Sequence, residues 1–222
     1  MTAERFRARL AERLSVVGLQ LEPDLAKQIE TYFQFLAAWN ARMNLTSFSL
    51  DDPSDEAIDR LLVEPLLAAG HVPAGVHELI DIGSGGGSPA IPLAMAANLR
   101  PCLVESKLKK AVFLREVFRA LDVRDARVEA QRFESLLAAT EHRNHYDLLS
   151  IRAVKVDSEV LAGLQALVAD GGYLFFFSRA GGLDEGSFAP PLTWCKTVPL
   201  LAHTRSTLVV CRKSLSESEC FT

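Results

Sequence analysis

The segment Asp81-Ile82-Gly83-Ser84-Gly85-Gly86-Gly87-Ser88-Pro89 decides the fold of this chain of 222 residues. It begins at the end of a mainly apolar run, residues 79–82, that is typical of a buried strand. A helix is predicted to follow it from about Pro89. The glycines permit positive φ angles and let a ligand approach the backbone closely. Ser88 is expected to cap this helix, with Pro89 in its first turn. Ligands of open α/β sheets bind at this edge, beyond the carboxyl ends of the strands.

Two carboxylates flank the glycine-rich segment. Asp81 ends the first predicted strand, and Glu105 ends the second, residues 102–105. A carboxylate just before the glycines disfavours a pyrophosphate and suits a ligand that carries an amino group and a sulfonium. Glu105 can accept hydrogen bonds from both hydroxyls of a ribose, although NAD sites share that feature. The pattern therefore indicates S-adenosylmethionine (SAM), and the alternative is a tight turn beside a surface acid.

From residue 77 onward, short apolar runs alternate with helical patterns. Such alternation is typical of a parallel α/β sheet that is covered by helices on both faces. Helices are predicted from about residue 89, over 107–121 and over 157–169. Strands are predicted at 79–82, 102–105, 127–130, 146–151 and 173–177, with a possible final hairpin at 193–200 and 206–212.

The first seventy residues are predicted to be helical. One helix face is spaced by three and four residues along Leu25, Ile29, Tyr32, Leu36, Trp39 and Met43. A helical pattern resumes over 55–69, after a break at 51–54. Tyr32 and Trp39 could stack on bases but are assigned to the core. We divide the chain into a helical cap and substrate region (1–72), a SAM-binding domain (73–213) and a flexible tail (214–222).

Composition excludes several classes of protein. No apolar run reaches the ~20 residues of a membrane span, and the N-terminus lacks the apolar core of a secretory signal. The net charge of −4 argues against non-specific coating of nucleic acid, although a local basic face would still allow RNA binding. The four cysteines lack zinc-ligand spacing. We expect a cytoplasmic protein without a bound metal.

Four motifs in order carry a family resemblance. They are Trp39-Asn40-x-x-x-Asn44-Leu45-Thr46, then Asp81 to Leu93 with its glycines, then Val104-Glu105-Ser106 followed by Lys109-Lys110 and Phe113-Leu114, and last Tyr146 to Ala153. In these motifs the chain resembles the ribosomal small-subunit methyltransferase G family, also called glucose-inhibited division protein B. The resemblance runs from about Tyr32 to Lys213.

This resemblance implies a Rossmann-like, class I SAM-dependent methyltransferase fold with an N-terminal helical cap. It also implies methylation at N7 of one guanine in 16S rRNA, within a small ribosomal subunit or its precursor, by a protein that we expect to be a monomer. By motif position, the residues expected beside SAM are Asp81, Gly83, Gly85, Ser88, Glu105, Phe133, Glu134 and Arg152. Contacts with the RNA are expected from Asn40, Asn44 and Arg205.

The chain departs from the family pattern at several positions. The family usually has a bulky residue at Ser88, a glycine at Ala90 and a serine at Ile151. In the segment from Arg60 to Leu66, Leu61 replaces the family's histidine and Glu64 replaces its aspartate. The pair Arg179-Ala180 only approximates a Lys-Gly pair. The cofactor motifs are retained, so these departures concern the contacts with substrate.

Guanine N7 already carries an in-plane lone pair, so its methylation needs alignment and no general base. Arg152, the one residue assigned to catalysis, is predicted to bind a phosphate, guanine O6 or the SAM carboxylate. The alternative is a salt bridge with Asp81 or Asp147. Arg152→Ala is expected to abolish transfer and leave folding intact. Asn40 and Asn44 could equally cap backbone at the helix end.

Two other readings of the sequence remain. The chain could be a SAM-dependent methyltransferase acting on a small molecule or a protein, which a closed apolar cleft would favour over a basic one. It could also be a non-catalytic nucleoside-binding module on a degenerate sheet. A nicotinamide dehydrogenase is least favoured, because no second catalytic domain follows the predicted sheet.

Overall fold

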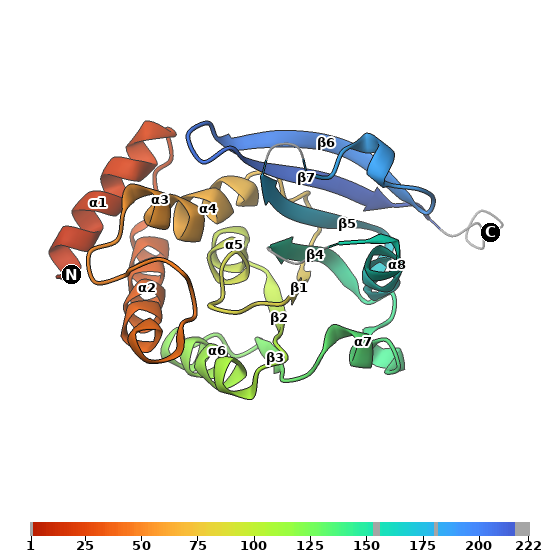
Figure 1. The fold of residues 1–222 in the computed structure, drawn as a ribbon, viewed down its shortest axis with the longest axis horizontal. Helices are drawn as coiled ribbons and strands as arrows, with labels where there is room; N and C mark the ends of the chain where they lie inside the picture. Colours follow the sequence, from red (N-terminus) through yellow and green to blue (C-terminus); the bar gives the residue numbers. More distant parts are fainter. Residues whose placement is uncertain (1, 153–155, 180–181, 216–222) are drawn as a thin grey trace.

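The computed structural model describes residues 2–152, 156–179 and 182–215. In this part of the chain, seven strands form one sheet in the order β3-β2-β1-β4-β5-β7-β6 (Figure 1). The strands β1 to β5 are parallel, and β7 and β6 add an antiparallel hairpin at one edge. Their bounds are β1 Glu78–Ile82, β2 Arg100–Val104, β3 Arg127–Glu129, β4 Tyr146–Arg152, β5 Val168–Arg179, β6 Leu192–Leu201 and β7 Ser206–Lys213. The predicted parallel sheet and the final hairpin are confirmed.

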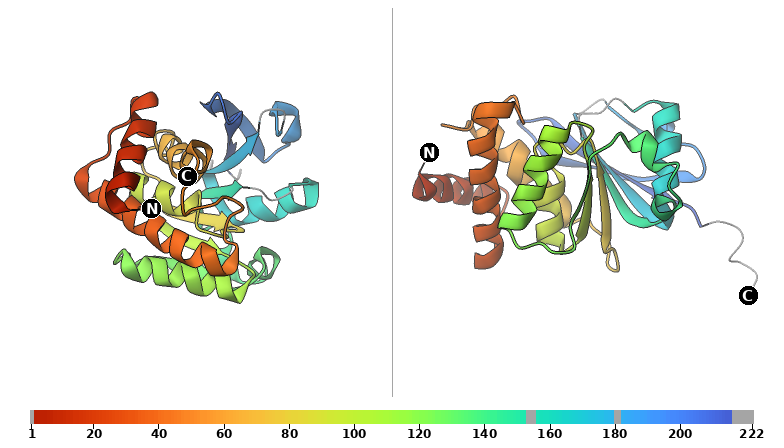
Figure 2. Two further views of the ribbon diagram at one scale, coloured as in Figure 1. Left: turned by 60° about the vertical axis from the view of Figure 1, so that its left-hand side comes forward. Right: turned by 90° about the horizontal axis from the view of Figure 1, so that it is seen from below.

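Helices cover both faces of this sheet (Figure 1, Figure 2). The helices α1–α6 lie on one side, and α7 and α8 lie on the other. Short 3-10 turns, η2 Thr140–His142 and η3 Glu185–Ser187, lie in loops. The helices are α1 Ala3–Val16, α2 Pro23–Met43, α3 Asp55–Ile58, the π-helix η1 Asp59–Val63, α4 Glu64–Ala69, α5 Ala90–Ala97, α6 Leu108–Ala120, α7 Phe133–Leu136 and α8 Ser158–Leu167.

The alternation of side chains along the strands fills the core on both faces. In β1, Leu79 packs with α4 and α5 residues, while Ile80 and Ile82 pack with α7 and α8 residues. Successive residues of a strand point to opposite faces, so a strand buried on both sides reads as a continuous apolar run. This is why Leu79–Ile82 was recognisable as a strand.

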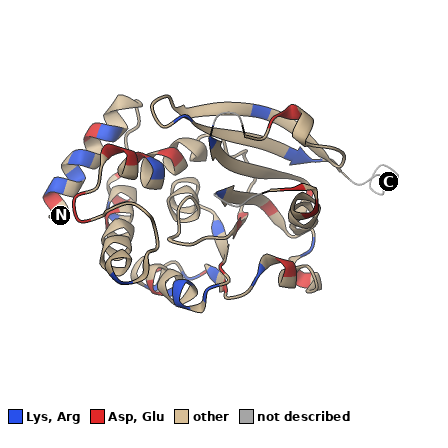
Figure 3. Cartoon of the chain, viewed as in Figure 1, with Lys and Arg blue, Asp and Glu red and all other residues tan. Residues whose placement is uncertain are grey.

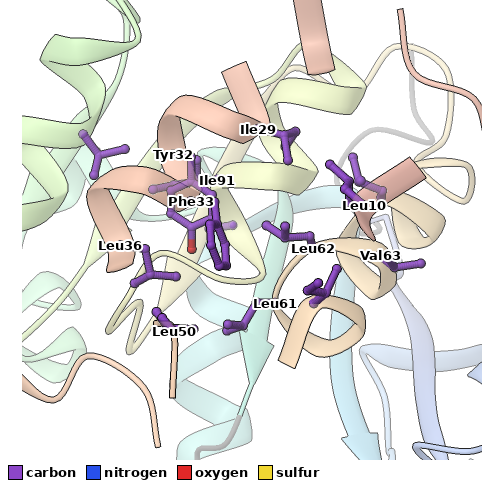
Figure 4. Close-up of a cluster of buried hydrophobic side chains, with 14 of the residues drawn as sticks. Leu10, Ile29, Tyr32, Phe33, Leu36, Leu50, Leu61, Leu62, Val63 and Ile91 are labelled. Carbon is purple, nitrogen blue, oxygen red and sulfur yellow. The ribbon is translucent and has the colours of Figure 1, made fainter. Parts of the chain in front are cut away.

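The N-terminal helices share their core with the sheet domain. Tyr32, Phe33 and Leu36 of α2 gather with Leu62 of η1 and Ile91 of α5 (Figure 4). The same apolar cluster continues to residues of β2 and α6. The predicted apolar face of α2 is therefore buried, and Pro23 occupies the first turn of this helix as predicted.

One local prediction is confirmed and another needs correction. The helical pattern predicted over 55–69 is present as α3, η1 and α4, and the middle turn, η1, is a π-helix. The helix predicted over 157–169 ends at Leu167, and the strand predicted at 173–177 is longer, because β5 begins at Val168, beside a register shift against β4. No helix of the described residues combines the length and the apolar character needed to cross a membrane. Ala153, Ala180 and residues 216–222 of the predicted tail lie outside the described residues.

Candidate functional site

The glycine-rich bend follows β1 and turns toward α5. Gly83, Gly85 and Gly87 have φ angles of 73°, 54° and 88°, which L side chains rarely adopt. At Gly87 an added Cβ would also lie 2.4 Å from Cδ1 of Ile91 and 3.3 Å from Cε2 of Tyr32, so a side chain there would force its neighbours to shift. The amides of Gly83 and Ser84 both donate to the carbonyl of Val104, at 2.9 and 3.1 Å. These bonds tie the bend to the end of β2.

The helix α2 forms a wall against the outer side of this bend. The hydroxyl of the fully buried Tyr32 donates to the carbonyl of Gly86 at 2.7 Å. A Cβ at Gly86 would lie 3.1 Å from Cδ1 of Leu36 and 3.3 Å from the carbonyl of Leu45. Gly86 is thus a glycine because the helical cap packs closely on it. The sequence placed Tyr32 in the core correctly but gave no sign of its bond to the bend.

The loop after α2 is shaped by the two asparagines that were candidates for substrate contact. Asn40 Oδ1 accepts from the amide of Thr46 at 2.9 Å, and its Nδ2 donates to the carbonyl of Phe48 at 3.1 Å. Asn44 ends the helix in the left-handed conformation, with φ of 50°. The backbone-capping alternative therefore describes both residues in this structure.

Both flanking carboxylates are bonded into the bend region. Ser150 Oγ donates to Oδ1 of the buried Asp81 at 2.5 Å. Glu105 accepts from the amide of Gly85 at 2.9 Å through Oε2 and from the amide of Lys107 at 2.8 Å through Oε1. Burial raises the pKa of Asp81 to about 6; bonds from serines lower it, and the charge of Glu105 raises it further. The two acids thus interact electrostatically, as their positions at neighbouring strand ends predicted.

Arg152, at the end of β4, forms a buried ion pair with Glu64. Its Nη2 lies 3.0 Å from Glu64 Oε2, and the two side chains are 10% and 1% exposed. Nη1 donates to the carbonyl of Arg60 and contacts Ser88 Oγ at 3.4 Å. The guanidinium stacks 4.6 Å from the ring centroid of Phe177. Burial lowers the pKa of Arg152 to about 10, and Glu64 opposes that shift.

The identity of this partner corrects the alternative predicted from the sequence, which named Asp81 or Asp147. Asp147 instead accepts from the amides of His77 and Glu78, at 2.8 and 2.9 Å. Arg152 Nε and Glu64 Oε1 have no hydrogen-bond partner among the residues that the structure describes. The site therefore holds a charged pair with unused hydrogen-bonding capacity.

Ser88 does not cap the following helix, which corrects a second prediction. Pro89 is the residue before α5, and no side chain caps the helix there. Ser88 Oγ instead donates to the carbonyl of Leu61 at 2.8 Å. The Leu61 carbonyl lacks the usual α-helical donor, because the residue four positions later is Pro65, which has no backbone N–H.

These elements enclose a cavity of about 310 Å³. Gly83, Gly85, Ser88 and Arg152, which the sequence assigned to the site, lie on its wall. The lining consists of Leu36, residues 45–48, Arg60, Leu61, residues 83–86, Ser88, Arg152 and Arg179. Thr46 and Arg60 were missed by the sequence interpretation, because neither belongs to the glycine-rich segment that signalled the site.

The candidates that do not line the cavity include Asn40, Asn44, Asp81 and Glu105, whose bonds are described above. Three further candidate site residues lie elsewhere in this structure. Phe133 packs against the apolar cluster of α8, and Glu134 is exposed beside it on α7. Arg205 is exposed in the turn between β6 and β7, with φ of 52°. None of the three lines the cavity. Their predicted contacts with cofactor or RNA remain predictions.

Known proteins resemble this chain in sequence and in fold. The family described as GidB, rRNA small subunit methyltransferase G, matches residues 25–186. Proteins named ribosomal RNA small subunit methyltransferase G from Syntrophotalea carbinolica and Roseiflexus sp. are 32% and 39% identical. The first alignment covers 92% of this chain and 97% of the relative. The second covers 62% and 58%, so it spans less than two thirds of the relative's length.

Solved structures show the same fold at low sequence identity. MtNAS in complex with S-adenosylmethionine aligns with a TM-score of 0.55 at 15% identity, over 84% of this chain and 72% of that one. TYW2 of P. horikoshii in complex with MeSAdo aligns with a TM-score of 0.54 at 12% identity, over 70% and 64%. The Rossmann-like, class I methyltransferase fold predicted from the motifs is confirmed. With the family match covering most of its length, the chain belongs to the rRNA small subunit methyltransferase G family.

Proposed function

We propose that this chain transfers the methyl group of SAM to N7 of a guanine in 16S rRNA. The observation that carries the proposal is a single site. In it, a glycine bend with three left-handed residues joins two strand-end carboxylates to a cavity lined by arginines. Family membership supports rRNA as the substrate and SAM as the methyl donor.

The polar groups of the site are suited to binding SAM. Each oxygen of Glu105 accepts one backbone bond and retains a lone pair for a ribose hydroxyl. The buried carboxylate of Asp81 suits a cationic ligand, since a positive charge would offset its desolvation. We assign Gly83 and Gly85 to backbone contacts with the ligand. When bound, SAM supplies an electrophilic methyl group on its sulfonium.

The contribution of the protein to the reaction is to align the methyl donor with the acceptor. Guanine N7 needs no base, and the described residues that line the cavity include no histidine, cysteine or carboxylate that could act as one. The rigid bend, held by Tyr32 and by the end of β2, fixes the position of the donor. A fixed acceptor beside it lets reacting atoms meet in line.

The pairing of Arg152 with Glu64 answers an electrostatic difficulty. Methylation makes the guanine cationic, so a lone arginine nearby would oppose the reaction. Because Glu64 offsets the charge of Arg152, the pair can donate a hydrogen bond to substrate or cofactor without adding net positive charge. We assign Arg152 to that role.

The charges on the surface bear on the choice between RNA and a small apolar substrate. The basic positions of α1 lie close to acidic positions around α3 (Figure 3). Arg9 and Arg13 pair there with Asp55 and Asp59, so the charge of the N-terminal helix is largely neutralised. The cavity, in contrast, carries three arginines. This favours an anionic substrate. We further propose that the protein acts as a monomer in the bacterial cytoplasm, on a small ribosomal subunit or its precursor.

A gene deletion tests the proposal. 16S rRNA from the deletion strain and its parent would be digested and mapped for 7-methylguanosine by mass spectrometry. We expect one site to lose its methyl group and to regain it when the gene is restored. An identical 7-methylguanosine pattern in both strains would refute the proposed target.

A further inference from the structure

The cavity beside the bend is strongly cationic. Arg60, Arg152 and Arg179 line it, and no carboxylate belongs to its described lining. The undescribed internal residues, 153–155 and 180–181, contain no aspartate or glutamate in the sequence either. A half-buried cavity with this balance of charge attracts anions.

The carboxylates closest in sequence to Arg60 are already paired with other cations. Asp59 accepts two bonds from Arg13, at 2.8 and 3.0 Å, and one from His203 at 2.7 Å. Glu64 pairs with Arg152. Arg60 forms no ion pair with any described carboxylate at 4.0 Å or less.

The guanidinium of Arg60 is held instead by a neutral group. Its Nη1 donates to the hydroxyl of the buried Ser206, at 3.2 Å, where β7 begins. Arg60 also lies close enough to Arg152 for its charge to lower the pKa of that residue, although burial is the main cause. Glu64 pairs with Arg152 alone, so the charge of Arg60 is left without a carboxylate partner among the described residues and the cavity carries a net positive charge.

Arg179 adds a second cation at the mouth. It ends β5, its side chain is 70% exposed, and its carboxylate neighbour Glu56 lies 3.9 Å away. An exposed pair at that distance contributes little and is easily exchanged for another anion. Arg179 is the register partner of Ser206, the residue that holds Arg60, and both arginines line the cavity, so the two cations are placed to bind one oxyanion.

The position in the sheet separates this pair from the predicted SAM residues. Asp81 lies near the end of β1 and Glu105 follows β2, whereas Arg179 ends β5, on the other side of β4. Neighbouring strands lie about 4.8 Å apart, so the ends of β1 and β5 are separated by about 10 Å. Arg179 therefore lies on the side of the cavity away from the predicted SAM carboxylates, which is the side left for the acceptor.

We infer that Arg60 and Arg179 form a phosphate subsite that holds the RNA backbone next to the target guanine. The inference rests on the proposed function and gives a role to two residues that the sequence did not assign to the site. A phosphate bound there would also offset the positive charge that the guanine gains on methylation. The carboxylate of SAM is the other oxyanion that could bind there. The experiment below distinguishes it from an RNA phosphate by measuring RNA binding and SAM binding separately.

The test compares Arg60→Gln, Arg60→Lys and Arg179→Gln with the control Arg143→Gln. Arg143 donates to a neutral acceptor, the carbonyl of Leu137. It precedes β4, so it lies at the amino ends of the strands, whereas the cavity lies at their carboxyl ends. Binding of 16S rRNA would be measured without SAM at several salt concentrations, and SAM affinity by calorimetry without RNA. Methyl transfer to small subunits from a deletion strain would be followed separately.

For each glutamine variant of the pair we expect RNA binding to weaken about tenfold and the salt slope of log Kd to fall by about one. Arg60→Lys should keep the slope, and Arg143→Gln should match the unsubstituted protein. SAM affinity should stay unchanged in all four.

Two results would overturn the inference. Unchanged RNA affinity in both glutamine variants would remove the subsite, and weaker SAM binding with normal RNA binding would assign these arginines to the SAM carboxylate. Failure of the proposed function has a different signature, since the unsubstituted protein would then transfer no methyl group to rRNA.

Discussion

Arg152 and Glu64 are buried together, so each side chain relies on its partner to compensate its charge. An ion pair buried to this degree contributes little by itself, but removal of one partner leaves an uncompensated charge in the interior. The expectation that Arg152→Ala would leave folding intact therefore changes. Loss of activity in that variant must be separated from loss of stability.

We expect Arg152→Ala to lower the free energy of unfolding by about 3 kcal/mol, since it strands the carboxylate of Glu64. Urea titration followed by circular dichroism measures this. The double variant Arg152→Met with Glu64→Leu removes both charges and should recover most of the loss. Equal stability of Arg152→Ala and the unsubstituted protein would show that the pair is not buried as described.

Asp81 gives the site a pH dependence with a definite sign. Its pKa is about 6 in the folded protein, and that of an unfolded aspartate is roughly 3.9. Between these values the folded state keeps a proton that the unfolded state has released, so stability falls as pH rises from about 4 to 6 and is level above. A cationic ligand needs the ionised form, so its affinity should rise over the same range.

We accordingly expect SAM to bind about tenfold more weakly at pH 5 than at pH 7, because about a tenth of Asp81 is ionised at pH 5. Calorimetry at both pH values checks this. In Asp81→Asn the affinity should be low at both pH values, with the step removed. A flat profile in the unsubstituted protein would exclude Asp81 from contact with the ligand's charge.

At the residue scale, the sequence predicted the groups near the bend but not their remote partners. Gly83, Gly85 and Glu105 follow strands that could be recognised locally, and their meeting at one sheet edge follows from the parallel order. Glu64 is 88 residues away from Arg152, and Arg60 lies in the cap. Only the packing of the cap on the sheet decides that these side chains meet.

The helix α2 joins the N-terminal region to the bend through the hydrogen bond of Tyr32 and the close packing of Leu36 on Gly86. Tyr32 Oη is the donor, and the carbonyl of Gly86 would otherwise lose its partner in an apolar region. An unsatisfied buried acceptor costs on the order of 1–3 kcal/mol. The cap therefore contributes directly to the shape of the site.

Tyr32→Phe should weaken SAM binding several-fold and also lower stability by about 1–3 kcal/mol, because the bend loses its anchor. The matched control is Tyr146→Phe. Tyr146, the first residue of β4, is also fully buried, and its hydroxyl forms a 2.8 Å hydrogen bond with Nδ1 of His142. This bond lies at the amino end of β4, away from the bend. The control variant should lose stability while keeping SAM affinity. Equal SAM affinity in the two variants would contradict the anchoring role of Tyr32.

At the element scale, periodicity predicted where helices lie but not their variant forms. The apolar spacing of α2 marks its buried face, and this prediction is confirmed. Over 55–69 the spacing is compatible with a regular helix, yet η1 adopts the π form, and its carbonyls at Arg60 and Leu61 accept bonds from Arg152 and Ser88. Those bonds come from distant elements and leave no periodic signal.

In the whole molecule, the helical cap and the sheet domain are separate regions of the sequence, but they share one hydrophobic core. One apolar cluster contains residues of α1, α2 and η1 together with residues of β2, α5 and α6. Separate domains would bury such surfaces independently. We propose that residues 1–72 and 73–213 unfold as a single cooperative unit.

The two tryptophans provide the measurement, since Trp39 lies in α2 and Trp194 in β6. The variant Trp194→Phe reports on the cap, and Trp39→Phe reports on the sheet. We expect fluorescence and circular dichroism to give coincident transitions in each variant. If the Trp39 signal were lost at a clearly lower urea concentration than the secondary structure, the cap would be an independent unit.

At this scale the sequence predicted the parallel sheet and its coverage because alternating strands and helices allow few arrangements. It did not predict that β7 lies between β5 and β6, which depends on which edge the hairpin joins. Nor did it predict the π turn and hairpin contacts that bring Arg60 to Ser206. Long-range packing determines both.

The central claim is methyl transfer to guanine N7 of 16S rRNA at the site formed by the bend and the arginine cavity. The most direct measurement incubates the purified protein with methyl-labelled SAM and small subunits from a deletion strain, followed by nuclease digestion and mass spectrometry. The account predicts label in 7-methylguanosine at one position, and no label with Asp81→Asn. Label on another atom or in another molecule, with none in 16S rRNA, would contradict it.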